Sequence, residues 1–587
     1  MNKKEILDKI KDLEGLNNDE KAFLINLVNT KKKYGLVWED KPEDVEEELR
    51  TKLPVLKEVK ERAIINDTET EHHPNHILIE GDNLHALTAL TFTHEGKIDL
   101  IYIDPPYNTG NKDFKYNDSF VDREDSYRDS KWLSFIGKRL RIAKQLLADK
   151  GVIFISIDDN EQAQLRILCD EIFGETNFMG NIIWQSRTSI SNDDFISTNH
   201  NHTKIYAKNI AEVKFDGEPI DHSDYKNPDN DERGPWKLVP IDANKAGGDT
   251  VYPIVNPKTG KEYYPPGKRI WAINQLTYQK LFDDGRIKFG LRDDSAPKRK
   301  LFLHERLEKG DSKTPSSILL NAGTTKDGTN ELIEILGEKK FDYPKPSKLI
   351  IRLLNYATQF NKEAVVLDFF AGSGTTLHAA MLLNKEDEGN RKCILVTNNE
   401  NNICEEVTLE RNKRLIKGYT NNKGEEVVGL INNNLRYYQC DFVDREPSLT
   451  NKRQLTLLAT ELLCIKEDCY KEITSELASK KWHKLFTGAN SHYVYIIYDD
   501  AFIEDAVELL KAFITQNPEA QIKVYVFSNG QYAYAEEFEE VAKNIRLAAL
   551  PDAIYKAYQY ILPKQNKEII PELEEETPVE FDNEIEA

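Results

Sequence analysis

The stretch from Ile98 to Gly110 constrains the fold of this chain more than any other. Its first six residues are almost all apolar and rich in β-branched side chains, which is typical of a strand buried on both faces of a parallel sheet. Pro105 and Pro106 end that strand, because proline lacks the N–H that a sheet ladder needs and has a fixed φ. The pattern therefore predicts that Asp104 and Tyr107 lie at the carboxyl edge of an open α/β sheet, where such folds bind ligands.

The groups at this turn suit the alkylation of a weakly nucleophilic amine. The exocyclic amine of a nucleobase is a poor nucleophile, since its lone pair is delocalised into the ring. The Asp104 carboxylate and the Pro105 carbonyl would accept its two hydrogens and aim the lone pair. The Tyr107 ring offers a stacking face, typically worth ~1–3 kcal/mol per base. A turn that merely ends a strand is the competing interpretation, and a second motif is needed to decide between the two.

That second motif has the same strand-then-turn form and spans residues 364–376. Gly372 and Gly374 let the backbone approach a ligand closely, and the helix that follows presents free N–H groups. Thr375 replaces the lysine of a phosphate-binding P-loop, and Leu377 stands where a dinucleotide fingerprint needs a small residue. A ligand-binding turn of another kind and a purely structural turn both remain open at this point.

Together, the two motifs resemble those of the amino-methyltransferases that use S-adenosylmethionine (SAM). Asp104 to Tyr107 is similar to the catalytic motif of that family, and Asp368 to Gly374 is similar to its SAM-binding motif. The order, catalytic motif first, is that of the β-class enzymes. The resemblance implies an α/β, Rossmann-like and mostly parallel sheet with helices on both faces, SAM as cofactor, and a catalytic site made of Asp104, Pro105, Pro106 and Tyr107.

The resemblance also implies cofactor contacts outside these motifs. Asp82 would lie near the cofactor's adenine, although it is an equally good helix N-cap and both roles can hold together. Lys345, in a Pro-Lys-Pro sequence, would complete the pocket, and either Asn398 or Glu400 would bind the ribose hydroxyls. The expected cofactor-binding residues are Asp82, Lys345, Asp368, Phe370, Gly372, Gly374, Thr375, Asn398 and Glu400.

Aromatic and basic residues interleave between the two motifs, where the resembled family keeps its target-recognition domain. Such groups on loops suit contacts to DNA grooves and phosphates, while an inserted hairpin with ordinary solvated lysines is the competing interpretation. The expected DNA-binding residues are Lys258, Lys261, Lys268, Arg269, Trp271, Lys298 and Arg299. A net charge of −21 argues against DNA binding by itself, but that charge averages over domains and a local basic surface can still bind phosphates.

The sequence predicts six segments and no metal site. We expect an N-terminal helical region (1–65), a catalytic half (66–211), a target-recognition domain (212–340), a SAM-binding half (341–430), a C-terminal α/β interaction domain (431–565) and an acidic disordered tail (566–587). The six cysteines are scattered without a CxxC pair, and His200 and His202 have no third ligand nearby in sequence. With no apolar run long enough for a membrane span, a cytoplasmic location is expected.

Over residues 75–440, the chain resembles the modification (Mod) subunit of type III restriction-modification systems. The aspartate at position 104, in place of a serine, resembles adenine-N6 more than cytosine-N4 methyltransferases. The resemblance implies double-stranded DNA as substrate, a homodimer, and a subunit that either needs a separate helicase-nuclease (Res) partner or acts alone. An RNA or protein amine methyltransferase and a non-catalytic DNA-recognition subunit are the alternatives.

Overall fold

The computed structural model describes residues 41–562 except 69–71, 118, 191–194, 216, 219, 245–249, 291, 293, 309–312, 490 and 560. Most of the predicted N-terminal helical region and all of the predicted acidic tail therefore lie outside the described residues. The chain divides into two compact units. The first comprises Met1–Phe215 with Ser316–Ala587, and the second, the inserted unit, comprises Asp216–Pro315.

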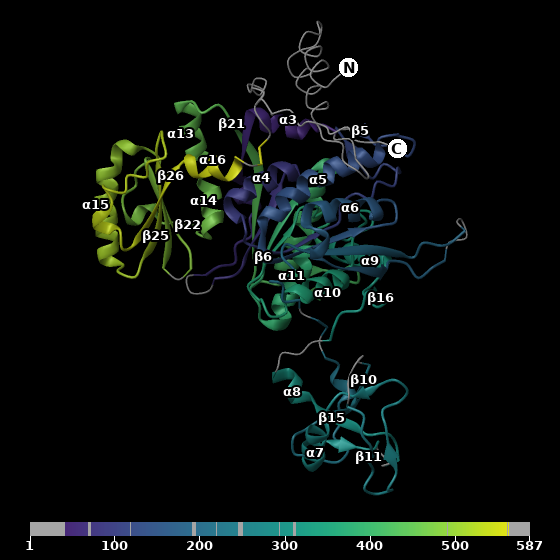
Figure 1. Cartoon of the computed structure of the whole chain (residues 1–587). Helices are drawn as coiled ribbons and strands as arrows, with labels where there is room; N and C mark the ends of the chain where they lie inside the picture. Colours follow the sequence, from purple (N-terminus) through teal and green to yellow (C-terminus); the bar gives the residue numbers. More distant parts are fainter. Residues whose placement is uncertain are drawn as a thin grey trace, which may run out of the picture. The chain divides into compact units, whose positions relative to one another are not determined.

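A ten-stranded sheet forms the centre of the first unit (Figure 1). Six neighbouring strands are parallel, in the order β21 (Asn434–Asp444), β2 (Asn75–Glu80), β18 (Lys392–Thr397), β17 (Val365–Asp368), β3 (Ile98–Ile103) and β6 (Leu147–Ile157). Beyond β6 lie antiparallel β8 (His200–Ala207), then β7 (Phe178–Gln185) and β16 (Ile318–Leu319). Antiparallel β1 (Lys52–Glu58) closes the other edge. This largely parallel sheet confirms the predicted α/β fold.

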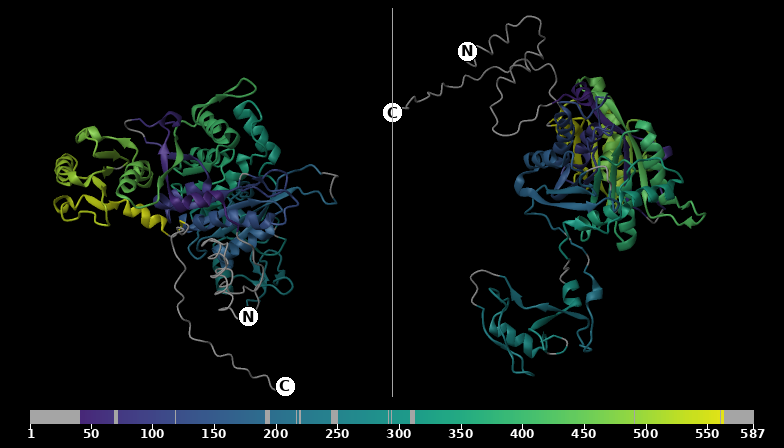
Figure 2. Two further views of the ribbon diagram at one scale, coloured as in Figure 1. Left: turned by 90° about the horizontal axis from the view of Figure 1, so that it is seen from above. Right: turned by 90° about the vertical axis from the view of Figure 1, so that its right-hand side faces the viewer.

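Helices cover both faces of this sheet, because its central strands bury side chains on both. In β3, Ile101 and Ile103 pack with α4 (Asn83–His94), α5 (Arg128–Leu146) and α6 (Gln162–Phe173). Leu100 and Tyr102 pack on the opposite face with α9 (Thr325–Leu336), α10 (Ser347–Thr358), α11 (Thr375–Asp387) and α12 (Glu410–Lys417). The right-hand view of Figure 2 shows blue and green helices on opposite sides of the sheet.

The described segments divide differently from the predicted domains. Helix α3 (Asp44–Thr51) leads into β1, which pairs with β21, so both strands belong to the large sheet rather than to terminal domains. Likewise β16 pairs with β7, and α9 packs into the core of the first unit. The compact inserted unit is thus narrower than the predicted range 212–340. Pairings between segments far apart in the sequence leave no local pattern, which is why the sequence did not reveal them.

A second, five-stranded sheet follows β21 and belongs to the same unit. Its order is β22 (Lys471–Glu472), β23 (His483–Thr487), β24 (His492–Ile497), β25 (Gln521–Phe527) and β26 (Ile545–Leu550). Helix α15 (Ile503–Gln516) packs on it, α13 (Leu449–Leu458) and α14 (Thr460–Glu467) precede it, and α16 (Asp552–Tyr558) follows it. Helices α14 and α16 contact α4, so this sheet is attached to the large one through shared apolar packing.

The inserted unit is built from short strands around a small aromatic core. Strands β9 (Trp236–Pro240), β14 (Ile287–Lys288) and β15 (Lys298–Phe302) form a three-stranded sheet. The strands β10 (Asp242–Ala243) and β13 (Ile270–Trp271) pair with each other, as do β11 (Ile254–Val255) and β12 (Glu262–Tyr263). Helices α7 (Gln275–Asp283) and α8 (Leu303–Glu308) complete it. Among the helices described in either unit, none has the length and apolar character needed to cross a membrane.

Candidate active site

Asp104 follows the last residue of β3 and is held by two donors. The Tyr107 hydroxyl donates to Asp104 Oδ1 at 2.7 Å, and Lys345 Nζ donates to Oδ2 at 2.5 Å. Lys345 Nζ also lies 5.1 Å from the centroid of the Tyr107 ring. The Lys345 side chain is 9% exposed and that of Asp104 is 26% exposed. The carboxylate is therefore fixed in orientation yet still open to a ligand.

The two prolines and Asn108 anchor this turn to the helices beside it. Pro105 is buried, and the Pro106 carbonyl accepts a hydrogen bond from Trp132 Nε1 at 2.7 Å. Asn108 adopts a left-handed conformation with φ 57° and is fully buried. Its amide donates to Glu161 Oε1 at 2.5 Å. Trp132 belongs to α5 and Glu161 to the segment before α6, so hydrogen bonds from both neighbouring segments fix the turn.

Tyr107 remains a neutral hydrogen-bond donor. Burial, and then the charge of Asp104, raises the pKa of its hydroxyl well above the usual value. Asn201 Nδ2, on β8, donates to the same hydroxyl oxygen at 3.3 Å. The sequence did not single out Asn201, because a contact between residues 94 positions apart leaves no local pattern.

The glycine-rich motif lies on the strand next to the catalytic motif. Leu367 of β17 pairs with Ile101 of β3 in parallel, so Asp368 and Asp104 leave the sheet at the same edge. Asp368 is 2% exposed and accepts hydrogen bonds from Thr376 Oγ1 at 2.5 Å and from the Phe370 amide at 3.0 Å. Burial raises the pKa of its carboxyl to about 7. Its hydrogen bonds among the described residues all hold the turn itself.

The two glycines of this turn adopt backbone conformations that side chains disfavour. Gly372 has φ 48° and Gly374 has φ 73°. A Cβ on Gly374 would lie 2.4 Å from Asn412 Nδ2, so this glycine is required by close packing against α12. Thr375 Oγ1 donates to the Lys345 carbonyl at 3.2 Å and accepts from Arg411 at 2.7 Å.

The turn before α4 contacts the glycine-rich motif. Asp82 caps α4 by accepting from the Leu84 amide at 2.7 Å, which confirms the cap interpretation and leaves the adenine contact a prediction. Asn83 Nδ2 donates to the Phe369 carbonyl at 3.0 Å. Arg139 of α5, which the sequence argument overlooked, is buried and donates to Asn83 Oδ1.

Asn398 and Glu400, at the end of β18, are both exposed. Glu400 Oε1 pairs with Lys115 Nζ at 2.6 Å, on the hairpin of β4 (Lys115–Tyr116) and β5 (Ser119–Phe120). The Asn398 side chain is uncharged and exposed, so it could also bind the ribose hydroxyls. Either residue remains a candidate ribose ligand.

These residues fit SAM in chemical character. Polar side chains at the end of β18 suit the ribose hydroxyls, and the half-buried ring of Phe370 offers an apolar surface. Helix α11 begins at Thr375, and its N-cap residue Gly374 provides no side-chain cap, so its first amides suit a carboxylate. The Lys345 ammonium group lies on Asp104. The donor set therefore matches a zwitterionic nucleoside.

In the inserted unit, most predicted DNA-binding residues are exposed, but Trp271 is not. The exposed or half-exposed residues are Lys258, Lys261, Lys268, Arg269, Lys298 and Arg299. Arg269 forms an ion pair with Asp242. Trp271 is 2% exposed, and its Nε1 donates to the Tyr252 carbonyl at 2.7 Å. The prediction of a DNA contact for Trp271 is wrong, because this side chain forms the core of the unit.

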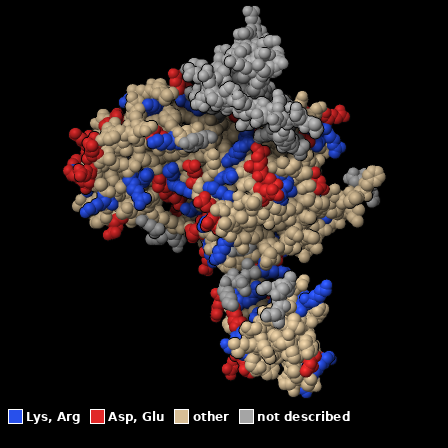
Figure 3. Space-filling view, viewed as in Figure 1, with Lys and Arg blue, Asp and Glu red and all other residues tan. Residues whose placement is uncertain are grey.

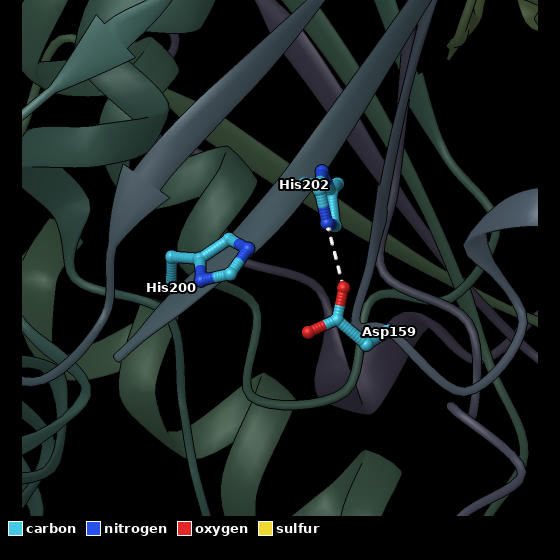
Figure 4. A group of neighbouring side chains, drawn as sticks. All are labelled: Asp159, His200 and His202. Atoms are coloured by element: carbon cyan, nitrogen blue, oxygen red, sulfur yellow. Dashed lines mark hydrogen bonds and ion pairs between the residues drawn. The ribbon is translucent and has the colours of Figure 1, made fainter. Parts of the chain in front are cut away.

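The structure places a third candidate metal ligand beside His200 and His202, from a part of the chain distant in sequence. Asp159 lies in the turn after β6. One of its carboxylate oxygens and one ring nitrogen from each of the two histidines all lie within 4.8 Å of one another. Figure 4 shows His202 pointing at Asp159, with His200 on the same strand. His202 Nε2 contacts Asp159 Oδ1 at 3.0 Å, and Nδ1 contacts Asn181 Nδ2 at 3.1 Å. Both nitrogens of His202 thus have partners within the protein.

The chain is similar to known proteins over the region that holds both turns. A family model described as DNA methylase matches residues 98–409, more than half of the chain. The StyLTI Mod subunit of a type III restriction-modification enzyme from Salmonella typhimurium is 37% identical over 362 residues, 57% of this chain and 54% of that protein. The EcoP15I Mod subunit of Escherichia coli is 30% identical over 453 residues, 66% of this chain and 67% of that protein.

A type II enzyme is similar as well. The methyltransferase M.KpnI of Klebsiella pneumoniae is 34% identical over 337 residues, 54% of this chain and 79% of that protein. The chain spans about half to two thirds of the type III Mod subunits that it matches. The match of the family model includes both the Asp104 turn and the glycine-rich turn, and we conclude that the chain belongs to the DNA methylase family.

Proposed function

We propose that the protein is a site-specific DNA adenine-N6 methyltransferase and the modification subunit of a type III restriction-modification system. The observation that carries the proposal is the partly exposed Asp104 carboxylate, oriented by Tyr107 and Lys345 beside the glycine-rich turn. The family includes N6 and N4 enzymes. An aspartate at position 104 favours adenine, and the type III relatives favour the Mod assignment.

In the proposed reaction the protein acts mainly by positioning. The target adenine is flipped out of the duplex and stacks against Tyr107. Asp104 and the Pro105 carbonyl accept the two amine hydrogens, which aims the lone pair outward. SAM, when bound, supplies the electrophilic methyl group. Since Lys345 Nζ occupies Asp104 Oδ2, the incoming amine must share or displace that contact.

Double-stranded DNA is the proposed substrate, and a homodimer with a separate Res partner is the proposed assembly. The exposed cations of the inserted unit are proposed to contact phosphates and to read an asymmetric site. Trp271 is excluded from this set because it is buried. Its proposed role is to hold the strands that present the cations.

Expression in a host without DNA methylation, followed by single-molecule kinetic sequencing of its genome, tests this proposal. We expect N6-methyladenine on one strand of a short asymmetric motif. N4-methylcytosine would overturn the choice of base. An unmodified genome, from folded protein that binds SAM, would overturn the activity itself.

A further inference from the structure

A basic pocket of about 420 Å³ lies within the first unit, away from the Asp104 turn. Its walls come from the end of α4 and the turn to β3, from α14, and from β25, β26 and α16. Four lysines line it, namely Lys97, Lys466, Lys523 and Lys556. Figure 3 shows Lys and Arg side chains gathered over the region where α4, α14 and α16 meet, with acidic side chains beside them.

Most of these ammonium groups do not meet a carboxylate. Lys466 donates to the Phe92 carbonyl, and Lys97 Nζ donates to the Lys466 carbonyl at 3.4 Å. Lys523 lies 5.6 Å from the Tyr525 ring and forms no ion pair with the residues that the structure describes. Lys556 pairs with Asp552 at 2.8 Å. Three of the four lysines therefore contact carbonyl oxygens or an aromatic ring, and only Lys556 forms an ion pair with a carboxylate among the described residues.

Nearby acidic groups offset this charge only in part. Glu95 lines the pocket, while Glu467 accepts a hydrogen bond from the Tyr525 hydroxyl at 2.7 Å. Burial, and then the charge of Lys97, lowers the pKa of Lys466 to about 8. Burial also lowers the pKa of Lys97. Cations that repel each other and are partly desolvated gain most from an anion placed between them.

We propose that this pocket binds a small molecule that carries a phosphate or polyphosphate group. Several ammonium donors around one cavity match a multivalent oxyanion, and the volume is in the usual range for small-molecule sites. Lys97 directly precedes β3, the strand that ends at Asp104, whereas Lys523 and Lys556 belong to the C-terminal sheet region. A bound phosphate would therefore link the C-terminal sheet region to the N-terminal end of β3, the strand that leads to Asp104.

The test uses the full-length protein and three probes: inorganic phosphate, pyrophosphate and ATP, each without magnesium and at ionic strength matched with sodium chloride. We expect saturable heat in calorimetry and a rise in the thermal unfolding temperature. Saturation by inorganic phosphate as strong as by the others identifies a free-phosphate site. Preference for pyrophosphate and ATP identifies a polyphosphate site.

Lys523→Ala should weaken binding at least about tenfold, as expected for a lost hydrogen bond to a charged group. Lys97→Ala, on the opposite wall of the pocket, should weaken binding by a similar factor. Agreement between the two variants would show that the loss does not come from misfolding of one of them. Lys543→Ala, at an exposed lysine outside the pocket, is the control and should bind as the parent does. No saturable effect beyond that of sodium chloride, or equal weakening by Lys523→Ala and Lys543→Ala, would overturn the proposal. Neither result would bear on the methyltransferase assignment.

Discussion

Replacement of Glu161 by glutamine should remove a pH dependence from the stability of the fold. The Glu161 side chain is fully buried, Asn108 contacts Oε1 at 2.5 Å, and Oε2 has no partner among the described residues. Burial raises the pKa of this carboxyl from 4.5 to about 8. The folded protein therefore keeps a proton at pH values where the unfolded chain has released it.

The sign and size of the effect follow from proton linkage. Between about pH 4.5 and pH 8, folding takes up a proton at this position, so the free energy of unfolding falls as the pH rises, by ~1.4 kcal/mol per unit. From about pH 5.5 to pH 7.5 this carboxyl alone should lower the free energy of unfolding of the wild type by about 3 kcal/mol. Glutamine has no titrating proton and fills nearly the same volume, so Glu161→Gln should lose none of this amount.

The assay is urea unfolding, followed by circular dichroism, of both proteins at those two pH values. We expect the stability of Glu161→Gln relative to wild type to increase by about 3 kcal/mol between them. Glu171→Gln, at an exposed position on α6, the helix that Glu161 precedes, should show no such change. A stability difference that is the same at both pH values would refute the argument that Glu161 is protonated in the folded state.

Three further substitutions test the site and the inserted unit. Asp104→Asn should reduce methyl transfer at least about 100-fold while calorimetry shows nearly unchanged SAM binding; transfer at near wild-type rate would refute the role of Asp104. Trp271→Ala should destabilise the inserted unit by ~3–5 kcal/mol and expose it to limited proteolysis, whereas Lys268→Ala should leave it folded and lower the salt dependence of DNA binding. Gly374→Ala should lower the thermal unfolding temperature, since its Cβ would lie 2.4 Å from Asn412 Nδ2; an unchanged temperature would show that the turn can relax.

The sequence was most informative where local pattern and position agree. The apolar run of β3 and the proline pair after it predict both a buried strand and its end, because both signals are contained in about ten residues. The same holds for β17 and the glycine-rich turn. That these strands are neighbours could be expected only from the resemblance, since the parallel pairing of Leu367 with Ile101 leaves no local trace.

In the inserted unit, residue type alone predicted the wrong role for Trp271, which is buried. Lys300, next to the expected DNA-binding residues Lys298 and Arg299, is buried as well. Lys300 pairs with Asp229 at 2.6 Å and with Asp231 at 2.7 Å. A unit of this size has few large apolar side chains, so its aromatic residues are needed for the core. Composition cannot distinguish a buried lysine that forms ion pairs with two aspartates from an exposed lysine that binds a DNA phosphate.

Lys345 shows why the two halves of the site cannot be treated as separate modules. Its ammonium group contacts Asp104 on the catalytic turn at 2.5 Å, and its carbonyl accepts a hydrogen bond from Thr375 at the start of α11. Because the side chain is almost fully buried, removing Asp104 leaves an unpaired charge, which typically costs several kcal/mol. Lys345 therefore contacts both halves of the site, one through its side chain and the other through its carbonyl.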